Sequence, residues 1–260
     1  TERADFRATS PAIAFLQEQV AREPARVAGL GATLFPGWSG AYSLEGINGP
    51  DALVNPYYRE LLLAGGVPQL WDWRFVLEAP TVPPLRAFLD ALNLAFLVVP
   101  HGDPYTGAGG YDLVSSSDLH VYRSRTAWPR AFFVDRAVAY ETLPQAVELL
   151  RSAEGQPLAL VAPGDAPTSL RVGSPDGRTV TPARDYRFTT NSTRFTIDAP
   201  AAGLAVLTEA FVPGAFEVTV NDRPAAYFRV NHAFRGIVLP QAGEYRICFT
   251  YRPALLRPAL

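Results

Sequence analysis

Apolar residues in the first half of the chain recur with helical spacing and then gather in short continuous runs. Serine-proline and asparagine-proline pairs predict helix starts at Ser10-Pro11 and Asn55-Pro56, since these residues suit the N-cap and first helical positions. A further helix is expected from Pro84, and residues 94–99 follow it as an apolar strand. Helices followed by buried strands predict an α/β layered domain.

The second half of the chain changes to a purely β pattern. Turn signals separate the strand candidates at intervals of about 8 to 12 residues, which predicts an antiparallel β-sandwich of immunoglobulin-like or jelly-roll-like type. Strands are expected at residues 186–189, 194–198, 203–210, 216–221, 225–229, 236–239 and 243–251, with a hairpin turn at Asn221-Asp222. Pro, Gly, Asp and Ser accumulate at residues 163–176, so we predict an α/β domain of residues 1–165 and a β-sandwich domain of residues 166–260.

Composition narrows the class of protein. The chain is 48% hydrophobic and 18% charged, which predicts a folded core, and its net charge of -2 gives no electrostatic argument for nucleic acid. All 23 basic residues are arginine, a side chain that suits bidentate contacts with carboxylate or phosphate better than lysine does. No apolar run reaches the length of about 18 residues that a membrane span needs. Cys248 is the single cysteine, so no disulfide forms within the chain.

The densest polar and aromatic cluster lies in residues 101–118, which we expect to form a Gly-rich loop. The loop follows an apolar strand, and open α/β sheets tend to bind ligands at the carboxyl ends of their strands. Carboxylates and aromatic rings suit sugars, so the predicted substrate-binding residues here are His101, Asp103, Tyr105, Tyr111 and Asp112. The alternative is an ordinary surface loop. His101, Asp103 and His120 have the chemistry of metal ligands, but their spacing matches no ligand pattern, and no metal is predicted.

A second candidate is the aromatic segment Trp71-Asp72-Trp73. In an extended backbone both indoles lie on one side, so Trp71 and Trp73 are predicted to line a groove for a glycan or a lipid-linked donor. The alternative is packing in the core or between domains.

Asn231 and Arg235 form a third candidate in the β half. Arg235 is predicted to bind a phosphate or carboxylate group of a ligand, with Asn231 beside it. The alternative is that Asn231 makes a turn and Arg235 pairs with a local acid. No activated serine, phosphate-binding loop or dinucleotide fingerprint appears, so neither a cofactor nor a catalytic residue is predicted.

The last third of the chain has a distinctive order of turns. An aromatic-Val-Pro-Gly turn at residues 211–214 precedes the Asn221-Asp222 turn, and a Gly243 turn leads to the closing strand. This order resembles the C-terminal extracytoplasmic module of the YfhO-like bacterial membrane proteins. Earlier segments of that family are resembled in the same order by residues 9–11, 15–16, 26–27, 46–50, 57–61, 92–98, 121–122 and 129–132. The family's turn usually continues with Trp, whereas here Ala215-Phe216 follows, so a stacking role there would fall to Phe216.

The resemblance implies a function. YfhO-like proteins look like polytopic glycosyltransferases that transfer a sugar from a polyprenyl-phosphate donor to a cell-envelope acceptor, with their catalytic acid in an early loop between membrane helices. This chain would be a soluble domain of such a protein, on the extracytoplasmic face of the bacterial plasma membrane. Its implied partners are a cell-envelope glycan or lipid-linked sugar and the transmembrane portion of the same polypeptide, and residues 255–260 would approach a final membrane helix.

Two other functions fit the sequence. The chain could be a non-catalytic structural or protein-interaction module of an envelope protein, in which the loops only pack. It could also be a free-standing glycoside hydrolase, which requires two facing carboxylates about 5 to 9.5 Å apart. The sequence offers acids but does not pair them in space.

Overall fold

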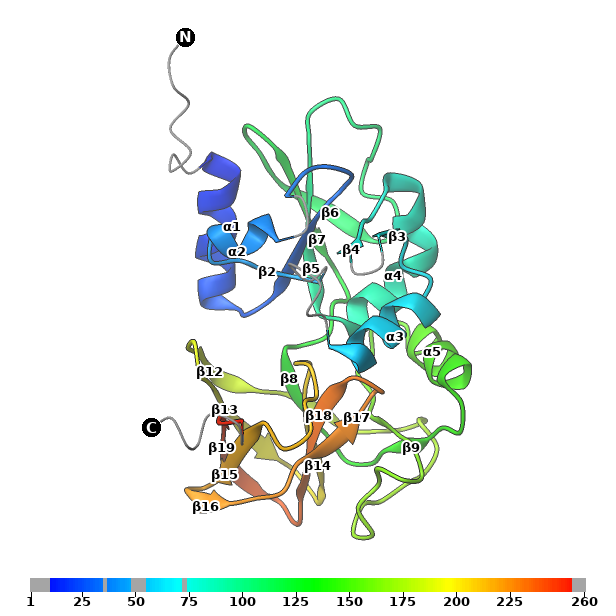
Figure 1. Ribbon diagram of the computed structural model, residues 1–260, viewed down its shortest axis with the longest axis vertical. Coiled ribbons are helices and arrows are strands. Elements are labelled where there is room, and N and C mark those ends of the chain that lie inside the picture. Colours follow the sequence, from blue (N-terminus) through cyan, green and yellow to red (C-terminus); the bar gives the residue numbers. More distant parts are fainter. Residues whose placement is uncertain (1–9, 35–36, 48–54, 72–73, 254–260) are drawn as a thin grey trace. The chain divides into compact units, whose positions relative to one another are not determined.

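The computed structural model describes residues 10–34, 37–47, 55–71 and 74–253. The chain forms two compact units (Figure 1). Unit 1 contains residues 1–54 and 67–127, and unit 2 contains residues 55–66 and 128–260.

Unit 1 is built on a five-stranded mixed sheet with the order β2-β1-β5-β7-β6. Strands β1 (Arg26–Gly29), β2 (Glu45–Gly46) and β5 (Leu94–Val99) are parallel, whereas β7 (His120–Ser124) and β6 (Tyr111–Ser116) are antiparallel additions. The other elements are α1 (Pro11–Arg22), α2 (Trp38–Ala41), the 3-10 turn η1 (Ala79–Thr81), α4 (Val82–Ala91) and the β3 (Gln69–Trp71) and β4 (Arg74–Phe75) hairpin. Parallel strands flanked by helices agree with the predicted α/β layer.

Helix α1 begins where the sequence predicts. The Ser10 hydroxyl accepts a hydrogen bond of 3.1 Å from the Ile13 N–H, and Pro11 occupies the first turn, where it has no N–H to satisfy. The buried side of the helix contributes Ile13 and Leu16 to a core cluster that includes Val27 of β1 and Val98 of β5.

The expected loop at residues 101–118 is only partly a loop. Its second half forms β6, which pairs with β7 so that Leu113 lies opposite Tyr122. Tyr111 at the start of β6 is 3% exposed, so the strand gains a buried aromatic anchor. The sequence pattern missed this strand because β6 is an edge strand whose remaining residues are mostly exposed.

Unit 2 contains the predicted β-sandwich, which confirms the mixed fold. One sheet has the order β11-β8-β14-β18-β17 and the other β12-β13-β19-β15-β16. The strands are β8 (Ala131–Val134), β11 (Val180–Pro182), β12 (Arg184–Phe188), β13 (Ser192–Ala199), β14 (Gly203–Leu207), β15 (Phe216–Val220), β16 (Arg223–Pro224), β17 (Phe228–Val230), β18 (Phe234–Leu239) and β19 (Gly243–Tyr251). The facing surfaces share one apolar core, which includes Phe133 and Ile237 from the first sheet and Phe195 and Phe249 from the second.

Two helices and a short sheet complete unit 2. They are α3 (Pro56–Ala64), α5 (Leu143–Ser152) and the parallel pair β9 (Val138–Ala139) and β10 (Leu160–Val161). Asn55 caps α3 as predicted, since its side-chain oxygen accepts a hydrogen bond of 3.0 Å from the Tyr58 N–H. The Asn221-Asp222 turn is also confirmed: both residues have positive φ and join β15 to β16.

The two units divide the chain at other places than the expected boundary at residue 165. Strand β8 precedes that boundary, yet it pairs with β14 in the sandwich, with Phe133 opposite Ala205. Residues 163–176, rich in Pro and Gly, connect β10 to β11 within unit 2. The composition of this segment correctly indicates a long connection, but the strand pairing shows that the connection lies within unit 2 and does not separate two domains. Among the described residues, no helix is both long and apolar enough to cross a bilayer.

Asp90 is a fully buried carboxylate of unit 1. It lies on α4, where its oxygens accept hydrogen bonds from the hydroxyls of Ser124 at 2.8 Å and Thr126 at 2.7 Å, and Arg86 contacts it at 3.2 Å. These bonds join α4 to the end of β7. Burial is the largest influence on the pKa of Asp90 and raises it above its ordinary value, although the hydroxyls and Arg86 oppose that effect.

We predict a pH-dependent contribution of Asp90 to stability. With its pKa raised in the folded state, the folded protein holds this proton more tightly, so the contribution is present below the unfolded pKa and is lost as pH rises through the folded one. In urea denaturation from about pH 3 to about pH 7, the free energy of unfolding of Asp90→Asn should therefore rise relative to wild type as pH increases.

The matched control is the exposed Asp112, whose pKa is lowered by a hydrogen bond from Arg125. Asp112→Asn should change in the opposite direction, losing stability relative to wild type as pH rises. Parallel pH profiles for Asp90→Asn and wild type would contradict the prediction.

Candidate functional site

The predicted residues at positions 101–105 make local contacts in unit 1. The His101 Nε2 atom lies 2.7 Å from the Ser117 carbonyl oxygen, and the Asp103 carboxylate accepts a hydrogen bond of 2.9 Å from the Tyr105 N–H. Tyr105 is 5% exposed, and its hydroxyl donates to the Ala108 carbonyl at 2.8 Å. The Asx turn at Asp103 and the hydrogen bond of the Tyr105 hydroxyl account for the shape of this loop.

Tyr111 and Asp112 lie next to each other on β6 but face opposite ways. Tyr111 is buried, with its hydroxyl 3.4 Å from the Leu94 carbonyl oxygen. Asp112 is exposed and forms a two-pronged ion pair with Arg125, with one Nε to oxygen distance of 2.7 Å. Of these two residues, Asp112 alone presents its polar group at the surface, and its carboxylate is already paired with Arg125.

The tryptophan pair falls at the limit of the described chain. Trp71 ends β3, and Trp73 lies outside the described residues. The predicted placement of both indoles on one side of a groove therefore stays a prediction.

The two histidines of unit 1 do come together. The rings of His101 and His120 meet edge to face with their centroids 4.2 Å apart. The carboxylate of Asp103 serves the turn described above, and no group of three or more His, Cys, Asp or Glu side chains arranged to hold a metal occurs in the part of the chain that the structure describes.

Asn231 is fully buried in unit 2 and binds backbone. Its side-chain oxygen accepts from the Leu160 N–H at 2.6 Å, and its amide donates to the Leu158 carbonyl at 3.1 Å. Its own N–H donates to the Leu160 carbonyl at 2.8 Å. The residue sits in the β17–β18 hairpin with a φ of 48°. Asn231 thus connects this hairpin to residues 158–160 by hydrogen bonds. Its position in the turn agrees with the alternative prediction that Asn231 makes a turn.

Arg235 is also buried, and it pairs with an acid that the sequence reading overlooked. Its Nη1 atom lies 3.2 Å from Glu209 Oε2, and its Nε donates to the Ala210 carbonyl at 3.0 Å. Its guanidinium carbon lies 3.5 Å from the ring centroid of Phe216. Arg235 thus covers the ring that the family resemblance suggested as a stacking platform. Loss of hydration on burial lowers the pKa of Arg235, and Glu209 partly offsets that effect.

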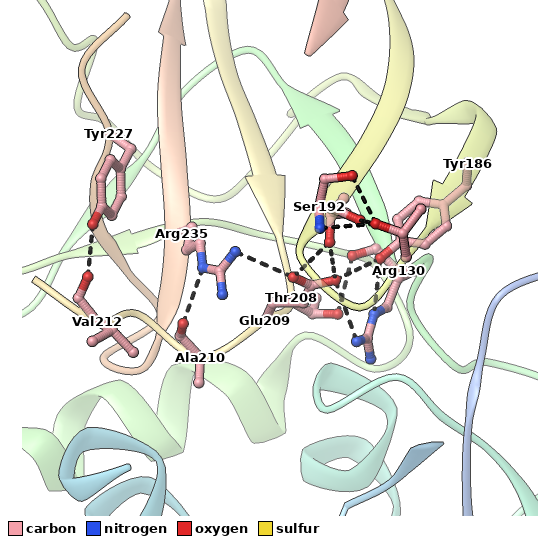
Figure 2. Close-up of polar contacts among 11 residues, drawn as sticks. Arg130, Tyr186, Ser192, Thr208, Glu209, Ala210, Val212, Tyr227 and Arg235 are labelled. Atoms are coloured by element: carbon pink, nitrogen blue, oxygen red, sulfur yellow. Dashed lines mark hydrogen bonds and ion pairs between the residues drawn. The ribbon is translucent and has the colours of Figure 1, made fainter. Parts of the chain in front are cut away.

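Glu209 is the hub of a buried polar network that spans the sandwich. Figure 2 shows its carboxylate between Arg235 and Arg130, with Tyr186 beside it. The Tyr186 hydroxyl donates to Glu209 Oε1 at 2.7 Å, and the Thr193 hydroxyl lies 3.1 Å from both carboxylate oxygens. Arg130 directly precedes β8 and Arg235 lies on β18, both strands of the first sheet. Tyr186 and Thr193 lie on β12 and β13 of the second sheet. One carboxylate therefore links both sheets.

The outer face of the second sheet carries the candidate binding site. An open depression of about 500 Å³ lies over β12, β13, β19 and β15, away from the sandwich core. Its polar lining residues are Arg187, Arg194, Arg246, Thr196, Thr219, Cys248, Asp185 and Asp222. The two aspartates pair with Arg184 and Arg246, so the donors left for a ligand are the threonine hydroxyls and the guanidinium groups of Arg187 and Arg194. These donors suit a ligand rich in oxygen.

Strand register brings Arg187 and Arg194 directly opposite each other. The pair belongs to the antiparallel ladder of β12 and β13, and both side chains are exposed. Residues in such a pair have Cβ atoms about 5 Å apart, and like charges there repel. Their neighbours Tyr186 and Thr193 point inward to Glu209, so the same two strands present an anchored inner face and a basic outer face.

The sequence reading missed Arg187, Arg194 and Glu209, although two signals were present. Residues 190–191 lie midway between the two arginines, so a hairpin turn there sets them opposite each other. Glu209 is a charged residue next to the apolar run 203–207, which is unusual unless a partner is buried with it.

No protein-family model matches the chain, and comparison with curated proteins and with solved structures finds no significant similarity.

We predict that Glu209→Ala destabilises the protein by about 3 to 5 kcal/mol, because it removes the acceptor shared by two buried arginines. Urea denaturation measures the change. Glu244→Ala is the matched control, since Glu244 pairs with Arg184 on the exposed outer face and its removal should cost about 1 kcal/mol or less. Equal effects of the two substitutions would show that the Glu209 network does not hold the sandwich together.

Asn231→Asp should also destabilise the protein. The substitution keeps the size of the side chain but replaces the donor facing the Leu158 carbonyl by an acceptor. A buried group without a partner costs about 1 to 3 kcal/mol, and thermal or urea unfolding would detect it. Stability equal to wild type would mean that the bonds between Asn231 and residues 158–160 contribute nothing measurable.

Proposed function

We propose that the chain is a glycan-engaging domain of a bacterial envelope membrane protein and that it binds its ligand in the depression on the outer face of the β12-β13-β19-β15-β16 sheet. One observation carries the proposal: a depression of about 500 Å³, with arginine, threonine and aspartate side chains in its lining, on a sheet face that is not part of the core. Sugars present many hydroxyls, and such donors and acceptors on neighbouring strands suit them.

The sheet offers a preorganised surface for such a ligand. Backbone ladders fix the spacing between strands, and the Glu209 network holds β12 and β13 from behind. A site on rigid strands keeps its groups in place without the ligand having to order them. The depression therefore lies on a sheet face whose shape is set before a ligand binds.

The role in the parent protein follows from the resemblance to YfhO-like glycosyltransferases. The domain would lie on the extracytoplasmic face of the membrane and hold a cell-envelope acceptor, while residues of the transmembrane portion transfer sugar from a lipid-linked donor. Its contribution would be positioning, which converts an encounter between two substrates into a reaction of bound groups.

A structural or protein-interaction module is the second candidate. Strand β6 lies at the edge of the unit 1 sheet, and its neighbouring residues Leu113 and Val114 are 51% and 40% exposed. An exposed edge strand with apolar side chains can accept a strand from another protein. This candidate involves unit 1, whereas the glycan proposal involves unit 2.

The proposal is tested by a saturation-transfer NMR screen of the chain against envelope polysaccharide fragments. We expect saturable binding, and we expect Thr219→Trp to abolish it for every ligand, because the indole fills the depression. Glu217→Trp is the matched control, since Glu217 lies on the same strand outside the lining and should leave binding unchanged. If no fragment binds with a Kd below about 1 mM, the structural module becomes the better reading.

A further inference from the structure

We infer that Arg187 and Arg194 form an oxyanion clamp, so that the ligand of the outer face is an acidic glycan carrying carboxylate or phosphate groups. The inference rests on the proposed function, since it names the ligand class of the same depression. Four features of unit 2 support it.

The first feature is that the two guanidinium groups have no partner in the part of the chain that the structure describes. Within the described residues, the side chain of neither Arg187 nor Arg194 has a hydrogen bond, an ion pair or a ring contact. They nevertheless stand opposite each other in the ladder, where two positive charges destabilise the fold. A cross-strand arginine pair with no counterion is costly for the free protein, and an anion bound between the two would remove that cost.

The second feature is that the nearby carboxylates form ion pairs with other arginines. Arg184 on the same face contacts three carboxylates: Asp185 at 2.5 Å, Asp198 at 2.8 Å and Glu244 at 2.5 Å. Arg246 pairs with Asp222 at 3.1 Å. Glu217, also on this face, pairs with Arg252. The carboxylates of this face, including Asp185 and Asp222 of the lining, are thus paired with Arg184, Arg246 and Arg252. Positive charge is left at one spot of the depression, although the whole chain has a net charge of -2.

The third feature is the rigid backing of the pair. Tyr186 precedes Arg187 and Thr193 precedes Arg194, and both inner side chains bind the Glu209 carboxylate. The backbone that carries each arginine is therefore fixed by a buried contact. Two arginines that extend from fixed backbone positions on neighbouring strands can share one tetrahedral or planar oxyanion, with each guanidinium group contributing a fork of donors.

The fourth feature is the set of neutral groups beside the pair. Along the sheet, Arg194 lies opposite Cys248, which in turn lies opposite Thr219, and Thr196 lies opposite Arg246. The threonine hydroxyls can bind sugar hydroxyls next to the anionic group. This combination favours an acidic sugar polymer over a small inorganic anion, which would use only the arginines.

The experiment compares three oligosaccharides of equal length by isothermal titration calorimetry: one with uronic-acid carboxylates, one with phosphodiester links and one neutral. We expect one or both acidic ligands to bind at least about tenfold tighter than the neutral one, with an affinity that falls as salt rises. The arm that binds better identifies the source of the oxyanion. Inorganic phosphate, followed through the arginine Nε–H signals in NMR, should perturb Arg187 and Arg194 first.

Variants separate a binding role from a structural one. Arg187→Gln and Arg194→Gln should each weaken acidic ligands about tenfold or more and leave neutral ones unchanged. Arg223→Gln, on β16 of the same sheet but outside the lining, should change neither. Without ligand, Arg194→Glu should keep or raise the unfolding midpoint, because it replaces a repulsive pair by an attractive one. A residue needed only for folding would lower it.

Each outcome decides a different point. Equal binding of neutral and acidic ligands, insensitive to Arg187→Gln and Arg194→Gln, would overturn the clamp and leave the glycan-engaging function standing. Binding of no oligosaccharide at all would overturn both. Binding that Arg223→Gln weakens as much as Arg194→Gln would show a diffuse charge effect and overturn the clamp.

Discussion

The burial of one carboxylate between the two sheets of unit 2 is the constraint on which the sandwich depends. Glu209 accepts hydrogen bonds from Tyr186 and Thr193 on one sheet and pairs with Arg130 and Arg235 on the side of the other. Removing such charges from water is costly, so they must be satisfied by one another, and that requirement fixes how the two sheets face each other. The apolar core around the network supplies the driving force, whereas the network supplies the register.

The same constraint shapes the surface that we propose binds a ligand. Side chains alternate across a strand, so each inner residue held by Glu209 sets an outer neighbour in place. Tyr186 and Thr193 thereby position Arg187 and Arg194. The repulsion between the two arginines is tolerated because the strands beneath them are fixed from the inside. Stability of the core and the chemistry of the outer face are in this way properties of the same short segment of chain.

Unit 1 follows a different logic, in which polar groups are satisfied by a turn, a surface ion pair and one contact between a helix and a strand rather than by a single central network. Asp103 completes a turn, Asp112 pairs with Arg125, and Asp90 closes α4 against the end of β7. The dense polar and aromatic cluster at residues 101–118 therefore serves mostly to shape the end of a small mixed sheet. Among the predicted residues there, His101 contacts a residue from another strand, because β5 and β7 bring its ring against that of His120.

The sequence by itself determined the elements that depend on neighbours in the chain. Ser10 and Asn55 cap helices, Asn221-Asp222 turns a hairpin, and alternating strands predicted the sandwich, because each signal acts over a few residues. Tertiary structure decided what depends on distant partners. It placed β8 in the sandwich, buried Asn231 against residues 158–160 and paired Arg235 with Glu209. It also left the side chains of Arg187 and Arg194 without a partner among the described residues. Local patterns set the direction of a side chain, but only the packing of separate strands sets which charge meets which.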